Sequence, residues 1–261
     1  MKIACVGDNC IDYYDSTGQA FPGGNAVNVA VYLRRLGWQA SYTGVVGDDR
    51  YGEYLCRALQ EWSVDISHLH VCPGKTALSH VSLVDGERRF GDYEEGVMAR
   101  FSLTDDDLRF LCQHDLVVTG LWGHTESSLP GIRRCGVPVA FDAAERPFDE
   151  AARIALPYAN LVFFSDDSQD DAALWKKMRV LKGQGPELIV ATRGKHGSTA
   201  YDGSSFYFTG PVPCQVVDTM GAGDSYIAGF LTAWLEKHSI PDCMQAGATN
   251  AAVTIAYRGA W

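Results

Sequence analysis

Short apolar runs alternate along the chain with longer segments of helical periodicity. The apolar runs at 2–7, 40–47, 115–120, 137–142, 160–165 and 187–192 predict buried strands. Most are separated by helical patterns, among them 23–37 and 49–62, and the first of these ends at Gly37. Alternation of this kind predicts an α/β chain with a mainly parallel central sheet and helices on both of its faces.

The segment 76–93 interrupts this alternation, because polar and apolar residues nearly alternate in it around a turn at 85–87. The pattern predicts an antiparallel β-hairpin. A hairpin does not easily join a parallel core, so we expect it to project as a small β lid from a single domain spanning residues 1–261. Because isolated hairpins are marginally stable in water, we also expect it to find a partner.

Composition narrows the class of protein. With 261 residues and 46% hydrophobic content, the chain is able to bury a sizeable core. Its net charge of -10 and the lack of a Lys/Arg-rich run disfavour nucleic acid as a partner. Nothing in the sequence resembles a membrane span or a signal-peptide core, so we expect a cytoplasmic protein with no membrane partner. The eight cysteines form no C-x-x-C pair or zinc-like cluster, and we interpret them as inert core thiols.

The stretch VVDTMGAGDSYIAGF, residues 216–230, carries the clearest chemistry. Gly221, Ala222 and Gly223 precede an apolar helical pattern, so their amides should lie at a helix start, which favours an anion such as phosphate. Asp224 beside that anion would accept the proton of a hydroxyl that attacks a phosphoryl group. On this stretch alone, an ordinary turn with a capping acid explains the residues equally well.

Two further motifs decide between these interpretations. D-T-x-G-A-G-D at 218–224 is accompanied by G-G-x-x-x-N-x-A at 23–30 and T-x-G-x-x-G at 192–197. In these motifs and their order the chain resembles the ribokinase-like, or phosphofructokinase-B, family of carbohydrate kinases. The resemblance implies a ribokinase-like three-layer α/β/α fold with a small β lid, ATP and Mg²⁺ as cofactors, and phosphoryl transfer to a small-molecule sugar.

The resemblance also implies roles for individual residues. Asp224 is the general base, and Gly221, Ala222 and Gly223 form the anion hole. Substrate hydroxyls are held by Asp12, expected at the end of the first strand, and by Gly23, Gly24 and Asn28, although an ordinary helix-start turn also explains the glycines. The nucleotide is held by Thr192, Gly194, Gly197, Gly223 and Asn250. For Asn250, packing of a buried helix on the sheet is an equally good explanation.

Within the family, segments such as GDNCID, RRFGDYEEGVMA and WGH resemble kinases of fructosamines, which are glycated amino acids such as fructoselysine. This implies transfer to the primary 6-hydroxyl of the sugar, with Asp92, or Glu94 or Glu95, reading the ammonium group. A solvated loop is the alternative for each acid. Kinases of fructose, ribose or adenosine-like nucleosides stay open, as does a non-catalytic sugar-binding module. A Rossmann oxidoreductase is disfavoured, because only Gly7 of the glycine fingerprint is present.

The sequence departs from the family pattern at the residues expected to organise magnesium. The family's N-x-x-E motif is replaced here, with Ser165 and Ser168 where the amide and the acid would stand. Four nearby acids, Asp166, Asp167, Asp170 and Asp171, are candidates for holding metal-bound water. The resemblance further implies a monovalent-cation site for K⁺ at Asp218 and Thr219, and a homodimer formed through the β lid.

Overall fold

The computed structural model describes the backbone of residues 1–84 and 87–261 and the side chains outside residues 83–90. Residues 85 and 86 of the turn predicted at 85–87 therefore lie outside the described part of the chain.

The described chain builds a nine-stranded central sheet in the order β13-β12-β11-β10-β9-β8-β1-β4-β5. All neighbours pair in parallel except β12 and β13, which extend the sheet antiparallel at one edge. The strands are β1 (Lys2–Val6), β4 (Gln39–Gly47), β5 (Asp65–Cys72), β8 (Leu116–Gly120), β9 (Val139–Asp142), β10 (Leu161–Ser165), β11 (Leu188–Thr192), β12 (Ser198–Tyr201) and β13 (Phe206–Thr209).

Helices cover both faces of this sheet, as the strand sequences require. In β1, Ile3 and Cys5 belong to one apolar core, whereas Ala4 and Val6 belong to the other. The first core is closed by α1 (Asn25–Arg35), α2 (Arg50–Glu61), α7 (Ala222–Leu235) and α8 (Ile240–Thr254). The second is closed by α3 (Asp105–Leu111), α4 (Leu129–Arg134), α5 (Glu150–Ala155) and α6 (Asp171–Lys182). The predicted three-layer α/β/α architecture is confirmed.

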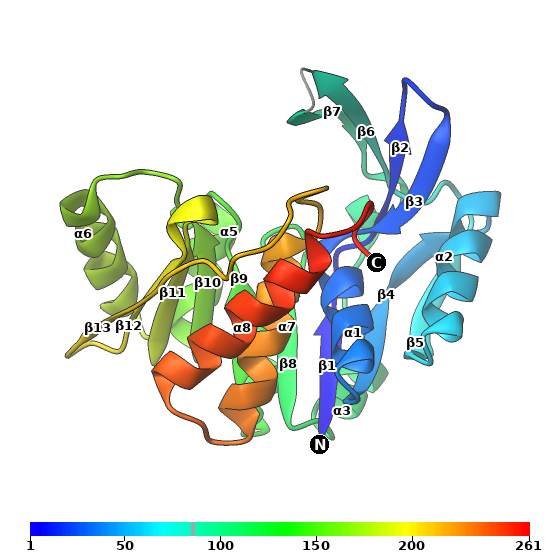
Figure 1. Cartoon of the computed structure of the whole chain (residues 1–261). Helices are drawn as coiled ribbons and strands as arrows, with labels where there is room; N and C mark the ends of the chain where they lie inside the picture. The colour runs from blue at the N-terminus through cyan, green and yellow to red at the C-terminus, as the bar shows by residue number, and fades with distance from the viewer. Residues whose placement is uncertain (85–86) are drawn as a thin grey trace.

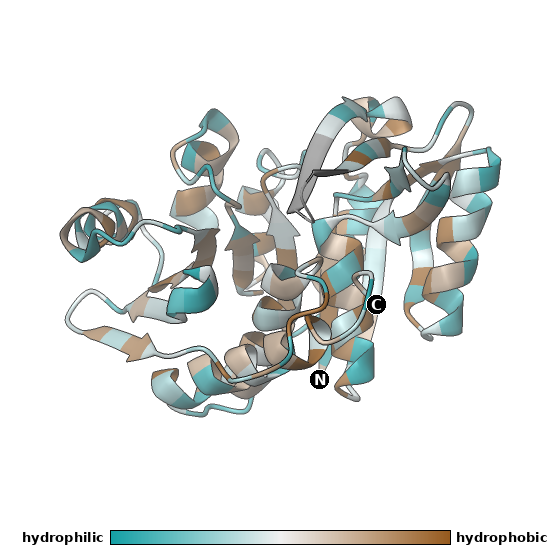
Figure 2. Cartoon of the chain, turned by 45° about the horizontal axis from the view of Figure 1, so that its top comes forward, coloured by the Kyte–Doolittle hydropathy of each residue, from teal (hydrophilic) through white to brown (hydrophobic). Residues whose placement is uncertain are grey.

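Hydropathy follows the same layers. Figure 2 shows hydrophobic residues recurring along the central strands and hydrophilic residues recurring along the helices that cover them. The described residues also form short 3-10 helices at η1 (Gly96–Arg100), η2 (Leu156–Tyr158) and η3 (Gly194–His196). Among the helices of the described residues, none combines the length and the apolar character needed to cross a bilayer.

A separate four-stranded sheet rises above one end of the central sheet as a lid (Figure 1). Its order is β3-β2-β6-β7, formed by β2 (Cys10–Tyr14), β3 (Gln19–Gly23), β6 (Leu78–Val84) and β7 (Glu87–Glu94). Strands β6 and β7 pair antiparallel, which confirms the predicted hairpin. The hairpin finds its partner within the same chain, because β6 pairs in parallel with β2.

The order of the central strands fixes where a ligand site is expected. From β1 the sheet runs to β4 and β5 on one side and to β8, β9 and β10 on the other. Chain connections therefore diverge around β1, and the carboxyl ends of its neighbours meet beneath the lid (Figure 1). In open α/β sheets, ligands bind at such a switch point.

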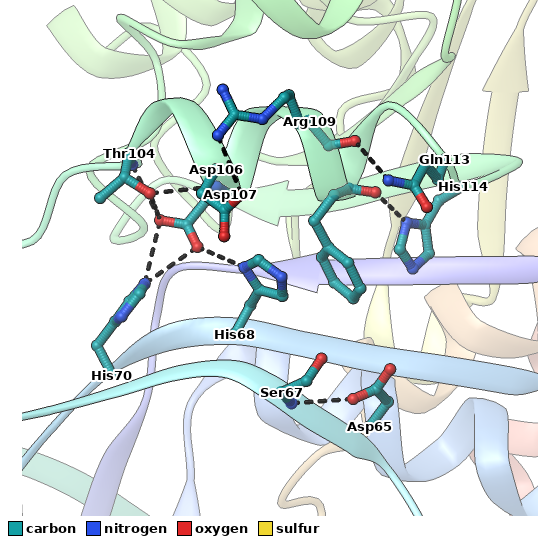
Figure 3. A network of polar contacts seen from close by, with 11 residues as sticks. Asp65, Ser67, His68, His70, Thr104, Asp106, Asp107, Arg109, Gln113 and His114 are labelled. Carbon is teal, nitrogen blue, oxygen red and sulfur yellow. Dashed lines mark hydrogen bonds and ion pairs between the residues drawn. The ribbon is translucent and has the colours of Figure 1, made fainter.

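A buried polar network ties the segment after the lid to the edge strand β5 (Figure 3). The carboxylate of Asp107, which is fully buried, accepts hydrogen bonds from the backbone N–H of Thr104 at 2.9 Å and from its hydroxyl at 2.7 Å. His68 and His70 contact the same carboxylate at 2.8 and 3.0 Å. This capping box and histidine pair fix the start of α3 against the sheet.

One expectation about the cysteines is wrong. Cys112 and Cys135, at the C-terminal caps of α3 and α4, form a disulfide with a Cα–Cα distance of 5.7 Å. The spacing of the cysteines gave no sign of it, because the two residues meet through the packing of the two helices. Cys5, Cys10 and Cys243 are buried thiols, as expected.

Candidate active site

Helix α7 begins without a side-chain cap. Its N-cap residue is Gly221, in the left-handed region at φ 71°, and a Cβ there would lie 2.4 Å from the hydroxyl oxygen of Tyr32. Gly223 is exposed, and a Cβ there would meet nothing within 4 Å. Helices α2, α3, α6 and α8 begin with a side chain that accepts a backbone N–H, whereas α1, α4 and α5, like α7, do not. The first turn of α7 is therefore open to an anion, as the sequence predicted.

Asp224 lies in that first turn and is half-buried. The side-chain amide of Asn25 donates to its Oδ1 at 2.7 Å, and the amide of Asn28 donates to its Oδ2 at 2.7 Å. Burial raises the pKa of Asp224 to about 6, the two amides oppose that rise, and the charge of Asp12 adds to it. The carboxylate is thus held as an acceptor on both oxygens, yet its pKa lies close to neutral pH.

Two further acids surround this carboxylate. Asn25 also donates through Nδ2 to Asp142, at the end of β9, at 2.8 Å, while its backbone N–H donates to Asp8 at 2.9 Å. Burial raises the pKa of Asp142 to about 7, and the charge of Asp224 raises it further. Burial also raises the pKa of Asp8 to about 7. Asn25 therefore links three carboxylates that come from the ends of β1 and β9 and from α7.

Asp12 contributes a fourth carboxylate from the lid. It lies within β2, so the expectation that it ends the first strand is wrong; that strand ends at Val6. Its carboxylate lies over Gly23 of the neighbouring strand β3, where a Cβ would stand 2.4 Å from Oδ2. Gly24 is the N-cap of α1, and Asn28 follows one turn later. The structure thus brings the predicted substrate residues Asp12, Gly23, Gly24 and Asn28 together with Asp224.

Asp92 and Glu94 of β7 lie away from the face of the lid that carries Asp12. Tyr93 is opposite Ser79, which is itself paired with Asp12, so these three residues share one face. Glu94 pairs with Leu78 on the other face. Asp92 is exposed, and its charge acts on His80, whose pKa is raised mainly by its hydrogen bond to Asp15. The predicted substrate residue Asp92 therefore lies beside His80, with no described contact to Asp12 or Asp224.

Glu95, just after β7, contacts a loop of the central sheet instead. Its carboxylate lies 3.0 Å from Nε2 of His124, in the loop after β8. His124 has a positive φ of 51°, and its charge acts on Asp8. Trp122 in the same loop is stacked by the guanidinium of Arg146, 5.2 Å from the ring centre. Glu95 is thus the acid of the sequence motif that faces the mouth of the site.

The predicted nucleotide residues fall into two places. Thr192 ends β11, with Gly194 in η3 and Gly197 just after it, so the T-x-G-x-x-G loop follows a strand as expected. Asn250 lies on α8, and its side-chain amide donates to the backbone oxygen of Ser225 on α7 at 2.8 Å. The contact of Asn250 favours the helix-packing alternative for this residue.

The acidic loop at 165–171 is largely occupied by its own contacts. Asp166 pairs with Lys177 at 2.7 Å, Asp170 caps α6 through the N–H of Ala173, and Asp171 pairs with Arg193 at 2.8 Å. Asp167 is exposed. Within the described residues, no group of three or more His, Cys, Asp or Glu side chains is arranged to hold a metal ion.

Asp218 ties the loop before α7 to the end of the chain. Its Oδ1 accepts the N–H of Met220 at 2.9 Å, and its Oδ2 accepts the N–H of Gly259 at 2.8 Å. The backbone oxygen of Thr219 accepts the N–H of Ala222. The carboxylate of Asp218 is thus engaged in shaping the loop in which the monovalent-cation site was expected.

A match to a protein-family model identifies the family of this chain. The model described as pfkB family carbohydrate kinase matches residues 2–261. The chain belongs to the pfkB family of carbohydrate kinases. The resemblance inferred from the three motifs is therefore confirmed over nearly the whole chain.

Curated members of the pfkB family align over the full length. A protein named fructoselysine 6-kinase from Shigella flexneri is 44% identical over 99% of both chains, and one of the same name from Escherichia coli (strain K12) is 43% identical over 99% of both. A protein named fructosamine kinase from Bacillus subtilis (strain 168) is 35% identical over 100% of this chain and 93% of its own.

Solved structures of more distant proteins share the fold. Arabidopsis thaliana ribokinase, complexed with ribose and ATP, superposes with a TM-score of 0.89 at 20% identity, over 99% of this chain and 93% of the other. An uncharacterised sugar kinase from Pyrococcus horikoshii superposes with a TM-score of 0.82 at 23% identity, over 100% of this chain and 94% of the other. These similarities confirm the ribokinase-like fold.

Sequence reasoning missed several residues of the candidate active site. Asn25 occupies a variable position of the G-G-x-x-x-N-x-A motif, so the motif gave it no role. Asp8 directly follows a predicted strand and Asp142 is the last residue of another, and that position at the carboxyl edge of the sheet was a signal that could have identified them. Trp261 donates its indole N–H to Oδ1 of Asn28 at 2.7 Å, and nothing in its local sequence indicates this contact.

Proposed function

We propose that this protein is an ATP-dependent kinase that phosphorylates the 6-hydroxyl of a fructosamine, with fructoselysine as the leading substrate. The observation that carries the proposal is the position of Asp224. It lies in the open first turn of α7, held by Asn25 and Asn28, with Asp12 of the lid acting on it electrostatically. The names of the relatives at 35–44% identity over nearly all of the chain support the substrate class.

In this mechanism the γ-phosphate of ATP lies against the backbone N–H groups of the first turn of α7, Gly221 to Gly223. The substrate 6-hydroxyl oxygen attacks the γ-phosphorus, and its proton passes to Asp224. The bond between the γ-phosphorus and the bridging oxygen breaks, and ADP leaves with the electron pair. The amides stabilise charge on the transferring group, and the base removes the proton as the new bond forms.

Residues of the lid and of the start of α1 would orient the sugar. Asp12 accepts hydroxyl hydrogen bonds, the backbone at Gly23 and Gly24 borders the ring, and Asn28 reaches it from α1. For the ammonium group of the amino acid we favour Glu95 over Asp92, because Glu95 contacts His124 at the mouth of the site while Asp92 lies beside His80. Closure of the lid would exclude water from the transfer step.

The metal ions of the reaction would enter with the nucleotide. When bound with the nucleotide, Mg²⁺ would neutralise charge on the transferring phosphate group, and it would keep much of its hydration shell. Of the four candidate acids, Asp167 fits best as a holder of metal-bound water, since the other three are engaged with Lys177, the α6 amide and Arg193. The loop of Asp218 and Thr219 is the proposed K⁺ site, through backbone oxygens. Thr192, Gly194 and Gly197 are proposed to line the nucleotide.

The test is an ADP-coupled assay with fructoselysine, other fructosamines, fructose, ribose and adenosine, followed by mass spectrometry and NMR of the product. We expect turnover of a fructosamine, with one added phosphate on C6. Turnover restricted to fructose, ribose or adenosine would refute the substrate class and leave the kinase class intact. Substrate binding without any product at saturating ATP would instead favour a sugar-binding module.

We also propose a homodimer formed through the lid and a cytoplasmic location. The lid supports the dimer because Phe21 and Tyr93 are 38% and 44% exposed on strands at its edges. The location is supported by the acidic composition and by the ATP that the reaction consumes. A monomeric mass in light scattering at micromolar concentration would contradict the dimer.

A further inference from the structure

A chain of hydrogen bonds runs from Trp261 to the proposed base. The indole N–H of Trp261 donates to Oδ1 of Asn28 at 2.7 Å, and Nδ2 of Asn28 donates to Oδ2 of Asp224 at 2.7 Å. An indole N–H only donates, so it fixes which end of the Asn28 amide points toward each neighbour. We propose that Trp261 is a positioning residue of the kinase, which orients the Asn28 amide so that its N–H faces Asp224. This inference rests on the proposed function.

Trp261 is held in place relative to both ends of this chain. The carbonyl oxygen of Ala260 accepts the hydroxyl of Tyr32, which is on the same helix as Asn28. The N–H of Gly259 donates to Asp218, in the loop that leads into α7. The indole itself is partly buried and packs against the core formed by α1 and α7. Its N–H therefore keeps a fixed position next to the Asn28 oxygen.

The orientation of Asn28 matters because the amide is buried. Only 4% of the residue is exposed, so water does not readily replace a lost partner of its oxygen. Without the indole N–H, the amide can rotate and place its oxygen against the carboxylate of Asp224. That rotation would replace a charge-assisted hydrogen bond by a repulsive contact between two acceptors.

Loss of this hydrogen bond changes the acidity of the base. A hydrogen bond to the ionised form lowers the pKa of a carboxyl, and Asn28 is the stronger of the two amides that oppose burial at Asp224. Other titratable groups around Asp224 are Asp8, Cys10, Asp12 and Asp142, together with the Tyr32 hydroxyl. Substitution of Trp261 removes none of these groups, so a shift of the base can be assigned to the amide.

The test is Trp261→Phe, which keeps an aromatic ring and removes the donor. We expect the pKa of Asp224 to rise by about one unit from its value of about 6. The kcat at saturating substrates should then fall about tenfold at pH 5 and stay within about twofold of the parent at pH 8. Trp234→Phe is the matched control, because Trp234 is a partly buried tryptophan of α7 that packs against the same core. It should leave the pH profile unchanged.

Two further measurements separate positioning from packing. Asn28→Ala alone should produce the same shift of the pH profile, and adding Trp261→Phe to it should shift the profile no further. An NMR titration of ¹³C-labelled aspartate, with Asp224→Asn to assign the signal, reads the pKa of Asp224 without any substrate. It tests the inference even if the proposed reaction fails.

The outcomes that would overturn the inference are distinct. An unchanged Asp224 pKa in Trp261→Phe would show that the indole does not orient the amide. An equal loss of kcat at every pH, with a lower melting temperature, would assign Trp261 to packing alone. A further shift when Trp261→Phe is added to Asn28→Ala would show that the tryptophan acts on the base by another route.

Discussion

At the scale of single residues, the environment of Asp224 balances opposing effects. Burial and the charge of Asp12 favour its protonated form, whereas the amides of Asn25 and Asn28 favour its ionised form. The result is a pKa of about 6, so the group is mostly ionised at neutral pH but is still a competent proton acceptor. Without the amides, burial and the charge of Asp12 would raise the pKa of this acid further.

Asp224→Asn keeps the shape of the side chain and removes its basicity. We expect kcat to fall by about 10²- to 10⁴-fold with the KM of the sugar nearly unchanged, and we expect no loss in melting temperature at neutral pH, because the substitution removes a buried charge. Steady-state kinetics and calorimetry check this, with Asp105→Asn on the exposed first turn of α3 as the control. Activity within about threefold of the parent would return Asp224 to the role of a helix-capping acid.

The pH dependence of kcat follows from the same carboxylate. Because the base must be ionised, kcat should rise about tenfold per pH unit below pH 6 and level off above it. A rate profile between pH 4.5 and 8.5 at saturating substrates measures this. If the residual activity of Asp224→Asn shows the same rising limb, another group titrates.

At the scale of elements, two glycines at the start of α7 should have different effects: Gly221 on stability and Gly223 on the binding of ATP. Gly221→Ala places a Cβ against the Tyr32 hydroxyl at a positive φ, so we expect a loss of roughly 1–3 kcal/mol in the free energy of unfolding. Gly223→Ala meets open space and should keep stability within about 0.5 kcal/mol, but its methyl group should obstruct the phosphate and raise the KM of ATP.

Denaturant titration measures the free energy of unfolding of both variants, and steady-state kinetics measures their KM for ATP. Equal losses of stability in the two variants would contradict the assignment of Gly221 to the helix start. An unchanged KM for ATP in Gly223→Ala would contradict the approach of phosphate to the first turn of α7.

Elements with strong local patterns were predictable, whereas those defined by distant partners were not. The parallel strands other than β5, and the hairpin, followed from apolar runs and from alternation. Strands β2 and β3 did not, because this short hairpin joins a larger sheet only where β2 pairs with β6 across more than 60 positions. Likewise, motif positions identified Asp224 and Asn28, but the clamp of Asn25 on Asp142 depends on the strand order.

The disulfide joins the ends of α3 and α4, and nothing in the sequence indicated that these two helices are in contact. It closes a loop of 23 positions between α3 and α4, which corresponds to about 3 kcal/mol of stabilisation in the chain-entropy model. Replacing both Cys112 and Cys135 by Ser should therefore lower the free energy of unfolding under oxidising conditions. In the presence of dithiothreitol, parent and variant should unfold alike. A difference that persists after reduction would point to packing of the thiols instead.

At the scale of the whole molecule, ionisation of the aspartates in the candidate active site destabilises the folded state at neutral pH. The raised pKa values of Asp8, Asp142 and Asp224 mean that the folded protein binds more protons than the unfolded chain, whose aspartates titrate near pH 4. The stabilisation from these protons is fully present below about pH 4 and is lost as pH rises through 6 to 7.

We therefore expect the melting temperature to fall between pH 5 and pH 8. Asp142→Asn removes one of the three titrations and should make that fall smaller. Calorimetry across this range compares the two proteins, and an identical pH dependence would show that Asp142 does not carry the effect.

The clamp on Asp224 also bears on how the protein folds. Asn28 is 196 positions from Asp224 and 233 from Trp261, and Asn25 is 117 from Asp142. Contacts at such separations form only after large loops have closed, whereas helices form from local contacts. On refolding from denaturant, catalytic competence should be the last property to return. Recovery of turnover will then trail the far-ultraviolet signal of the helices.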